Sequence, residues 1–243
     1  MSEPVRVARE GAVTRLTLNR PDRANALSAE MVEALLAALA AARGDGTRLL
    51  LLAGEGRHFC AGFDFTGIET ATDGDLALRF LRVETLLQEL YHAPFPTLAL
   101  AHGRVFGAGA DLVCCCGRRV AAPGTSFLMP GPRFGVVLGT RRLAARIGAD
   151  RAQAIQTASR AFDAGEAQAL GFLTGVSPVE DWPALVEEAR AAAEMLDAET
   201  VAALRAATIA DSRAADMAAL AVSVSRPGLK NRILAYRAAQ TRR

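Results

Sequence analysis

Two glycine-containing turns carry groups that could stabilise a developing negative charge. The segment HGRVFGAGADL (102–112) follows an apolar run at 97–101, and its small residues at 107–109 open the next apolar segment. A turn from a strand into a helix N-terminus leaves backbone N–H groups without intrahelical partners, so it can bind an anion or an oxyanion. A second turn, GEGRHFCAGFD (54–64), follows a leucine-rich run, and its Gly62 permits close backbone approach. The second turn strengthens the prediction of an oxyanion site.

Other interpretations of the first turn stay open. Its glycine spacing is G-x-x-x-G-x-G, which differs from the G-x-G-x-x-G of dinucleotide-binding turns. No acidic residue about twenty positions later offers a partner for a ribose. Glycines in front of a helix also serve close packing alone.

The composition indicates a globular protein without a strong charge bias. The chain has 243 residues, 51% of them hydrophobic, and a formal net charge of +2, so it can bury a substantial core and shows no general affinity for nucleic acid. Its apolar runs are too short to span a membrane, and its first residues lack the order of a signal peptide. We expect a cytoplasmic protein with neither nucleic acid nor a membrane as partner.

The four cysteines predict packing rather than chemistry. Cys60 stands alone, and the other three are adjacent at 114–116 within an apolar stretch. Neighbouring cysteines supply neither the spaced pairs of a zinc site nor a secreted disulfide framework. We expect reduced, buried thiols and no metal site.

Strand and helix patterns alternate along the chain, which predicts an α/β fold with right-handed crossovers. From residue 182 the composition becomes alanine-rich, charged and helical in pattern, so we expect a core at 1–180 and a helical region at 181–243. The segment 66–75 is polar and is predicted to be a mobile loop. The expected strands are 5–7, 13–18, 48–53, 97–101, 118–121 and one from 127; the expected helices are 28–43, 76–91, 140–147, 151–159 and 165–170.

Four motifs in this order resemble the crotonase superfamily, also called the enoyl-CoA hydratase/isomerase family. They are LNRPDRANAL (18–27), FCAGFDF (59–65), HGRVFGAGADL (102–112) and, more loosely, AFDAGEAQALGF (161–172). The resemblance implies a spiral of ββα units followed by a helical C-terminal trimerisation region. It therefore implies a homotrimer or a dimer of trimers.

The same resemblance implies an acyl-CoA thioester as ligand, with coenzyme A entering as part of the substrate rather than as a cofactor. The thioester oxygen would accept the backbone N–H groups of Phe63 and Ala108, and Asp111 would be the acid/base. Such donors stabilise an enolate. The residues that the resemblance places at the substrate or CoA are Arg23, Ala24, Ala61, Gly62, Phe63, Asp64, Gly107, Ala108 and Gly131.

The chain departs from the family pattern at both acidic positions. Hydratases of this family use two glutamates to activate water and to deliver a proton. The first aligns with Asp111, which is shorter by one methylene, roughly 1.5 Å. The second aligns with Gly131, which has no side chain, so efficient hydration is not expected.

Several functions stay open. Asp111 could move a proton between carbons, as in isomerisation, or could be structural. Gly131 could make room for a bulkier or carboxylated acyl group in a decarboxylase or thioester hydrolase, or the chain could bind acyl-CoA without catalysis. Residues that could replace the missing glutamate, unless they are only surface charges, are Glu69, Asp73, Asp75 and Glu84. Arg133, unless it too is only a surface charge, could bring a positive charge to this position and favour a carboxylated acyl group. His58 and His102 are expected to support their loops, and the basic residues after 225 to form a solvated face or to meet a phosphate.

Overall fold

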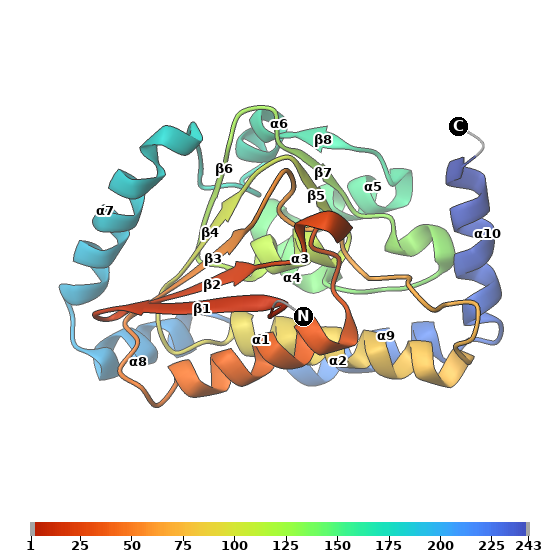
Figure 1. The fold of residues 1–243 in the computed structure, drawn as a ribbon, viewed down its shortest axis with the longest axis horizontal. Coiled ribbons are helices and arrows are strands. Elements are labelled where there is room, and N and C mark those ends of the chain that lie inside the picture. Colours follow the sequence, from red (N-terminus) through yellow and green to blue (C-terminus); the bar gives the residue numbers. More distant parts are fainter. Residues whose placement is uncertain (1–2, 242–243) are drawn as a thin grey trace.

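The computed structural model describes residues 3–241 and shows a twisted sheet with helices packed around it (Figure 1). Six strands form this main sheet. Their spatial order is β1 (Val5–Glu10), β2 (Val13–Leu18), β3 (Leu49–Gly54), β4 (Thr97–Ala101), β6 (Arg118–Ala121) and β9 (Gly175–Val176). β1 pairs with β2 in antiparallel orientation, and the other neighbours are parallel. The leucines of β3 are at most 2% exposed, as expected for a parallel strand covered on both faces.

A second sheet contains three short strands, β5 (Arg104–Phe106), β7 (Ser126–Leu128) and β8 (Phe162–Asp163). Phe127 and Phe162 stack with ring centroids 5.4 Å apart, and Phe172 packs edge-on against Phe127 at 5.1 Å. The two sheets and the crossover helices confirm the predicted α/β class. The sequence pattern did not predict β5, which occupies only the residues between Gly103 and Gly107.

Capping side chains define the starts of the two longest helices of the core. Ser28 caps α1 (Ala29–Ala42) by accepting the Met31 N–H, as predicted. Thr72 and Asp75 form a capping box at the start of α2 (Asp73–Tyr91), so the end of the segment predicted as a loop at 66–75 is helical. The remaining core helices are α3 (Ala108–Cys115), α4 (Thr140–Ile147), α5 (Ala149–Ala158) and α6 (Ala164–Ala169).

Four helices follow the strands, and the first, third and fourth of them contribute buried residues to the hydrophobic core. They are α7 (Trp182–Glu194), α8 (Ala198–Thr208), α9 (Arg213–Val224) and α10 (Leu229–Thr241), with α7 and α10 at opposite ends of the molecule (Figure 1). Leu220 on α9 and Ile233 on α10 are fully buried in the main hydrophobic core. Asp73 accepts the N–H groups of residues 228–230 and so joins the start of α10 to the start of α2. The division at residue 180 and the trimer stay predictions.

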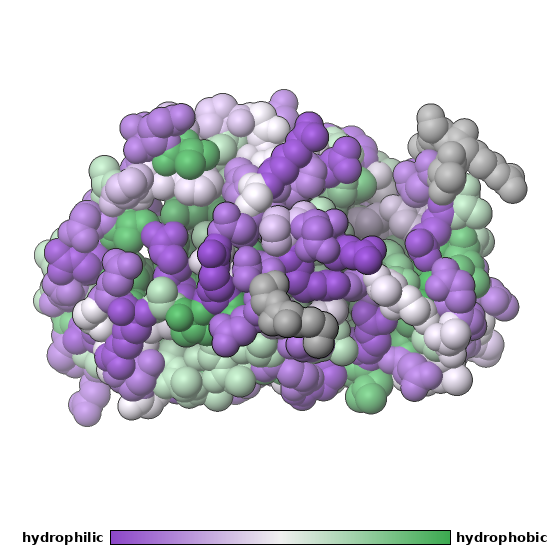
Figure 2. All heavy atoms as spheres, viewed as in Figure 1, coloured by the Kyte–Doolittle hydropathy of each residue, from purple (hydrophilic) through white to green (hydrophobic). Residues whose placement is uncertain are grey.

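The cysteines lie in the interior of the protein, and hydrophilic side chains dominate one of its faces. All four cysteines are free and buried, which confirms their predicted packing role. Hydrophilic side chains cover most of the face shown in Figure 2, with smaller hydrophobic areas between them. Within residues 3–241, no helix is both long enough and apolar enough to cross a bilayer.

Candidate active site

The two glycine-containing turns lie directly against each other. Cys60 and Val105 form an isolated parallel β-bridge, and the Phe106 N–H donates to the Cys60 carbonyl at 2.9 Å. Gly62 adopts a φ of +89°, and a Cβ atom at this position would lie 2.6 Å from the Phe106 carbonyl oxygen and 3.3 Å from the Ala108 nitrogen. No larger residue fits this contact, so Gly62 brings its turn to the N-terminus of α3.

The hydrogen-bond pattern of the turn at 54–64 leaves the Phe63 N–H unused. The Leu27 N–H donates to the Gly62 carbonyl at 2.7 Å, and the Asp64 N–H donates to the Leu27 carbonyl at 3.2 Å. The Phe63 N–H lies between these two bonds and donates to no acceptor in the described part of the chain.

Ala108 presents a second unused donor. It is the first residue of α3, directly after Gly107 at a φ of +52°. The Gly107 carbonyl accepts the N–H groups of Ala110 and Asp111, whereas the Ala108 N–H has no acceptor within residues 3–241. Phe63 and Ala108 line the same cavity, so the predicted pair of donors is brought together.

This cavity has a volume of about 140 Å³ and a mostly apolar wall. Phe63 stacks on Phe80 with ring centroids 4.2 Å apart, and the Arg79 guanidinium lies over the Phe63 ring, 4.4 Å from its centroid. The lining residues are Ala61, Phe63, Phe65, Phe80, Phe106, Gly107, Ala108, Asp111, Leu128, Met129, Pro130, Gly131, Pro132, Phe134, Val136, Leu138, Gln156 and Tyr236. Polar side chains enter from Asp111, Gln156 and Tyr236 alone among these.

Asp111 lies in the first turn of α3 and is 6% exposed. Burial raises the pKa of its carboxyl group from 3.8 to about 7; the positive charge of Arg142 opposes this shift and the negative charge of Glu84 adds to it. A carboxyl group with this pKa is present in both protonation states near neutral pH. It can therefore accept a proton and return it.

A buried charge network stands behind Asp111. Arg142 on α4 is 2% exposed and donates to both oxygens of Glu84 on α2, at 2.9 and 2.5 Å. It also donates to Asp216 on α9 at 3.2 Å, and Asp216 accepts the Ser212 hydroxyl at 2.7 Å. Glu84 is thus a paired structural charge, and its proposed role as a replacement for the missing glutamate is wrong.

The other suggested replacements also have different roles. Asp73 holds α10, Asp75 belongs to the capping box of α2, and Glu69 lies 3.5 Å from Arg237 in an ion pair. Arg133 is exposed and does not line the cavity. No second carboxylate therefore replaces the missing glutamate among the described residues that line the cavity.

Gly131 lies in the cavity wall, at the start of a short 3₁₀ helix, Gly131–Phe134 (η2). A Cβ atom there would be 3.0 Å from the Val136 carbonyl oxygen, so a side chain could be accommodated only after a small shift. Gly139, in the following loop, packs against the Asp111 carboxyl group.

Some of the residues predicted to bind the CoA portion line the cavity, and others do not. Ala61 lines the cavity, and its N–H donates to the Ala24 carbonyl at 2.9 Å, which places the 21–24 turn beside it. Asp64 binds the Arg20 guanidinium at 2.8 Å and the Thr66 N–H at 2.9 Å, so it organises the loop. Arg23 is exposed outside the cavity. Contacts of these residues with CoA stay a prediction.

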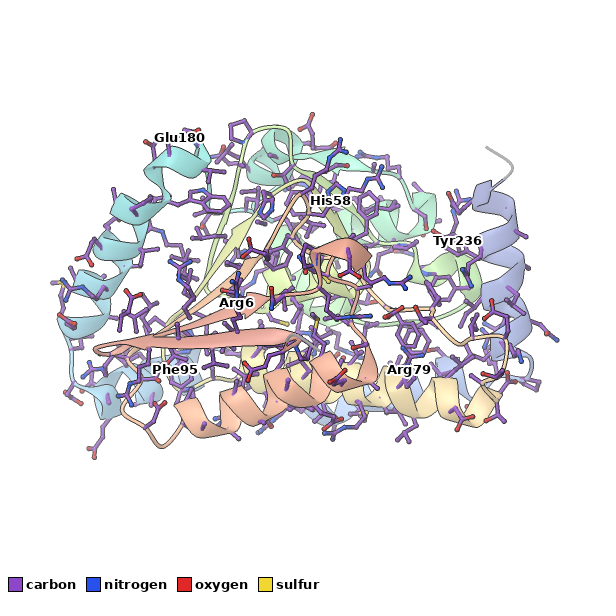
Figure 3. All side chains as sticks on the ribbon, in the orientation of Figure 1. Arg6, His58, Arg79, Phe95, Glu180 and Tyr236 are labelled. Carbon is purple, nitrogen blue, oxygen red and sulfur yellow. The ribbon has the colours of Figure 1, made fainter. Side chains whose placement is uncertain are left out.

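Gln156 and Tyr236 are cavity residues that the sequence interpretation missed. Gln156 is polar but occupies the same face of α5 as the buried Ala152 and Ile155, and this spacing was a usable signal. Tyr236 projects from α10 toward the body of the molecule (Figure 3). Its approach depends on how α10 docks, which no local pattern indicates.

The histidines and the basic tail support the structure around the site. The Nδ1 atom of His58 accepts the Arg104 N–H at 3.2 Å, and the Nε2 atom of His102 lies 2.7 Å from the Gly56 carbonyl, in agreement with their predicted supporting role. Arg232 donates to the Phe134 carbonyl at 3.0 Å and ties α10 to the cavity wall. Residues 242 and 243 of the tail lie outside the described residues.

Comparison with known proteins identifies the class to which this fold and site belong. The family model described as enoyl-CoA hydratase/isomerase matches residues 8–230, and the chain belongs to this family. The chain is 34% identical over 171 residues to the probable enoyl-CoA hydratase echA6 of Mycobacterium tuberculosis, a match that covers 67% of the chain and 68% of that protein. It is 30% identical over 216 residues to the human mitochondrial enoyl-CoA hydratase domain-containing protein 2, covering 84% of the chain and 72% of that protein.

Solved structures confirm the crotonase-like fold. A protein from Bordetella parapertussis, assigned as an enoyl-CoA hydratase/isomerase, superposes with a TM-score of 0.95 at 49% identity and covers 97% of this chain and 98% of its own. The enoyl-CoA hydratase from Bacillus halodurans superposes with a TM-score of 0.85 at 20% identity, over 96% of this chain and 99% of its own. The second match shows the fold alone.

Proposed function

We propose that this protein is an enzyme that acts on an acyl-CoA thioester through an enolate. The thioester carbonyl oxygen would accept the N–H groups of Phe63 and Ala108, which lack acceptors in the described protein and line one cavity. When a proton leaves the α-carbon, negative charge moves onto this oxygen. Each preorganised donor can then lower the barrier by about 3 kcal/mol.

Asp111 would act as the single acid/base in a double-bond isomerisation. Its carboxylate removes a proton from the α-carbon of a 3-enoyl thioester, and the C–H electron pair forms the dienolate. The resulting carboxylic acid, whose proton exchanges with solvent, gives a proton to the γ-carbon, and the double bond moves next to the thioester. Atoms and charge balance without water or a redox cofactor, and the pKa of about 7 suits both halves of the transfer.

One observation supports this choice: the cavity wall contains the two donors and one carboxyl group, and the lining residue Gly131, which aligns with the second glutamate of the family, has no side chain. Proton transfer between two carbons needs one group that alternates between base and acid. Hydration needs a further group that activates water. The arrangement thus favours an isomerase over a lyase that adds water.

The test is mass spectrometry of a mixed acyl-CoA panel in D₂O, with the purified protein and its Asp111→Ala variant. Deuterium uptake at carbon that depends on Asp111 would support the proposal. Uptake that persists in the variant would remove Asp111 from the acid/base role. Gain of water, loss of CO₂ or release of free CoA would instead identify a hydratase, a decarboxylase or a thioester hydrolase, and binding without any change would identify a catalytically silent homologue.

A further inference from the structure

Gln156 places a polar group in the otherwise apolar part of the cavity. Its side chain comes from α5, is 8% exposed and lines the cavity. The Thr140 hydroxyl donates to its Oε1 atom at 3.0 Å. Because the amide group is planar, this bond also fixes the direction of the Nε2 donor.

The Nε2 group has no acceptor in the part of the chain that the structure describes. Among the described residues, the Gln156 side chain makes one hydrogen bond, which it accepts from the Thr140 hydroxyl through its Oε1 atom. Gln156 is 8% exposed and its Nε2 atom is not fully buried, so this donor is accessible and an acceptor on a ligand there would be favourable. The cavity is the space in which that acceptor can be supplied.

Thr140 also relates the amide to the proposed acid/base. Its neighbour Gly139 packs against the Asp111 carboxyl group, so one two-residue segment contacts Asp111 and holds Gln156. Both polar side chains therefore enter the cavity from the same part of its wall. A ligand that presents its α-carbon to Asp111 would extend along a path that includes Gln156.

The charges around the cavity restrict what the acceptor can be. No lysine or arginine is among its described lining residues, and Asp111 becomes negative when it acts as a base. A carboxylate buried there would be repelled and would lack a cation. A neutral carbonyl or hydroxyl oxygen fits both the donor and the charge.

We propose that Gln156 is a specificity-determining residue whose Nε2 group donates a hydrogen bond to a neutral oxygen on the acyl chain. The preferred ligands are then oxo- or hydroxyacyl-CoA thioesters rather than plain alkyl ones. This inference rests on the proposed function, because it assumes that the cavity holds the acyl group of a CoA thioester.

The test measures dissociation constants by isothermal titration calorimetry for hexanoyl-CoA, 3-hydroxyhexanoyl-CoA and 5-oxohexanoyl-CoA. These saturated chains cannot isomerise, so binding is separated from turnover. The wild-type protein should bind at least one oxygenated ligand about tenfold more tightly than hexanoyl-CoA, since one net hydrogen bond has about this effect. Gln156→Leu should abolish that preference while hexanoyl-CoA still binds.

Two further variants keep the result interpretable. Gln153→Leu makes the same change at an exposed position of α5 and should retain the preference. Gln156→Glu keeps the shape of the side chain but replaces the NH₂ donor with oxygen. If Gln156→Leu fails to fold, Gln156→Glu takes its place in the test and should also abolish the preference. If Gln156→Leu retains the preference, or if the wild-type protein shows none, the inference is overturned and the proposed function stands. If none of the CoA thioesters binds to the wild-type protein, the proposed function itself fails.

Discussion

Gly139 packs directly against the carboxyl group of Asp111, at a backbone φ of +67°. A side chain at this position would collide with the Asp111 oxygen atoms. The contact closes one side of the carboxyl group to water, which is consistent with burial as the largest cause of its raised pKa. The loop before α4 thus sets the environment of the proposed acid/base.

Gly139→Ala should impair catalysis by displacing Asp111. We expect Asp111-dependent deuterium uptake to fall by about tenfold or more, because small displacements of a reacting group are costly. The matched control is Gly11→Ala, since Gly11 has a similar φ of +61° but no atom within 4 Å of an added Cβ. Both variants should lose about 1 kcal/mol of stability to left-handed backbone strain. Equal activities would contradict the proposed contact.

Asp111→Asn should change the pH dependence of stability in a defined direction. The folded protein keeps the Asp111 proton up to about pH 7, whereas the unfolded chain releases it near the ordinary pKa of 3.8. The unfolded state then binds fewer protons between these values, so the Asp111 contribution to stability falls as pH rises. Urea unfolding should show Asp111→Asn gaining stability relative to wild type between pH 4.5 and pH 8.

Asp64→Asn provides the opposite case. The pKa of Asp64 is lowered by its hydrogen bonds to Thr66 and Arg20, despite the opposing effect of burial, which is the largest single influence. Its stabilising contribution is present above its unfolded pKa and is lost as pH falls. The stability of Asp64→Asn relative to wild type should therefore decrease as the pH rises from 3 to 6. The same direction of change in both variants would refute the assignment.

The rate of proton transfer should follow the ionisation of Asp111. The first step needs the carboxylate, so Asp111-dependent deuterium uptake should increase with pH and level off above a midpoint near 7. Initial rates at subsaturating acyl-CoA report this pKa in the free enzyme. A midpoint near 4 would mean that the carboxyl group is solvated in solution.

Arg142→Met should be strongly destabilising. It leaves Glu84 buried without its cation and Asp216 with Arg141 as its remaining ion-pair partner, a change that typically costs about 3–5 kcal/mol. Arg190→Met removes the ion pairs of an arginine with 40% side-chain exposure and should have little effect on stability, because water screens exposed ion pairs. Denaturant unfolding of the two variants measures the difference. Similar losses of stability would show that the buried network does not stabilise the packing of α2, α4 and α9 more than an exposed ion pair does.

Gly131→Glu tests why hydration is not expected. If the missing carboxylate is the cause, the variant should hydrate crotonyl-CoA at least about tenfold faster than wild type. Gly131→Ala controls for the 3.0 Å contact with the Val136 carbonyl, which any side chain must accommodate. A folded Gly131→Glu protein that binds acyl-CoA but gains no hydration would point to different chemistry.

Local patterns predicted most of the fold because they depend on neighbours in the sequence. The strands at 97–101 and 118–121 and the helix at 140–147 match the structure, and Ser28 caps its helix as expected. The start of α2 was placed too late because the capping box of Thr72 and Asp75 lies within a polar stretch. The strand β5 was missed since it is stabilised by pairing with β7, which is distant in the sequence.

The candidate site was predicted where backbone conformation carries the chemistry. The glycines in the sequence predicted the turns that contain Phe63 and Ala108, and in the structure both residues line one cavity. Side chains that meet only in three dimensions were not predictable in this way. Glu84 looked like a surface charge because its partner Arg142 lies 58 residues away, and Tyr236 reaches the cavity from the last helix.

The position of Tyr236 has a consequence for how the cavity comes into existence. The N-terminal part of a chain leaves the ribosome first, and domains fold as their residues emerge. The two turns and α3 can assemble early, but the wall that includes Tyr236 is completed only after α10 docks through Asp73 and Arg232. A nascent chain halted before residue 229 should thus lack a closed cavity, so ligand capture would report the docking of α10.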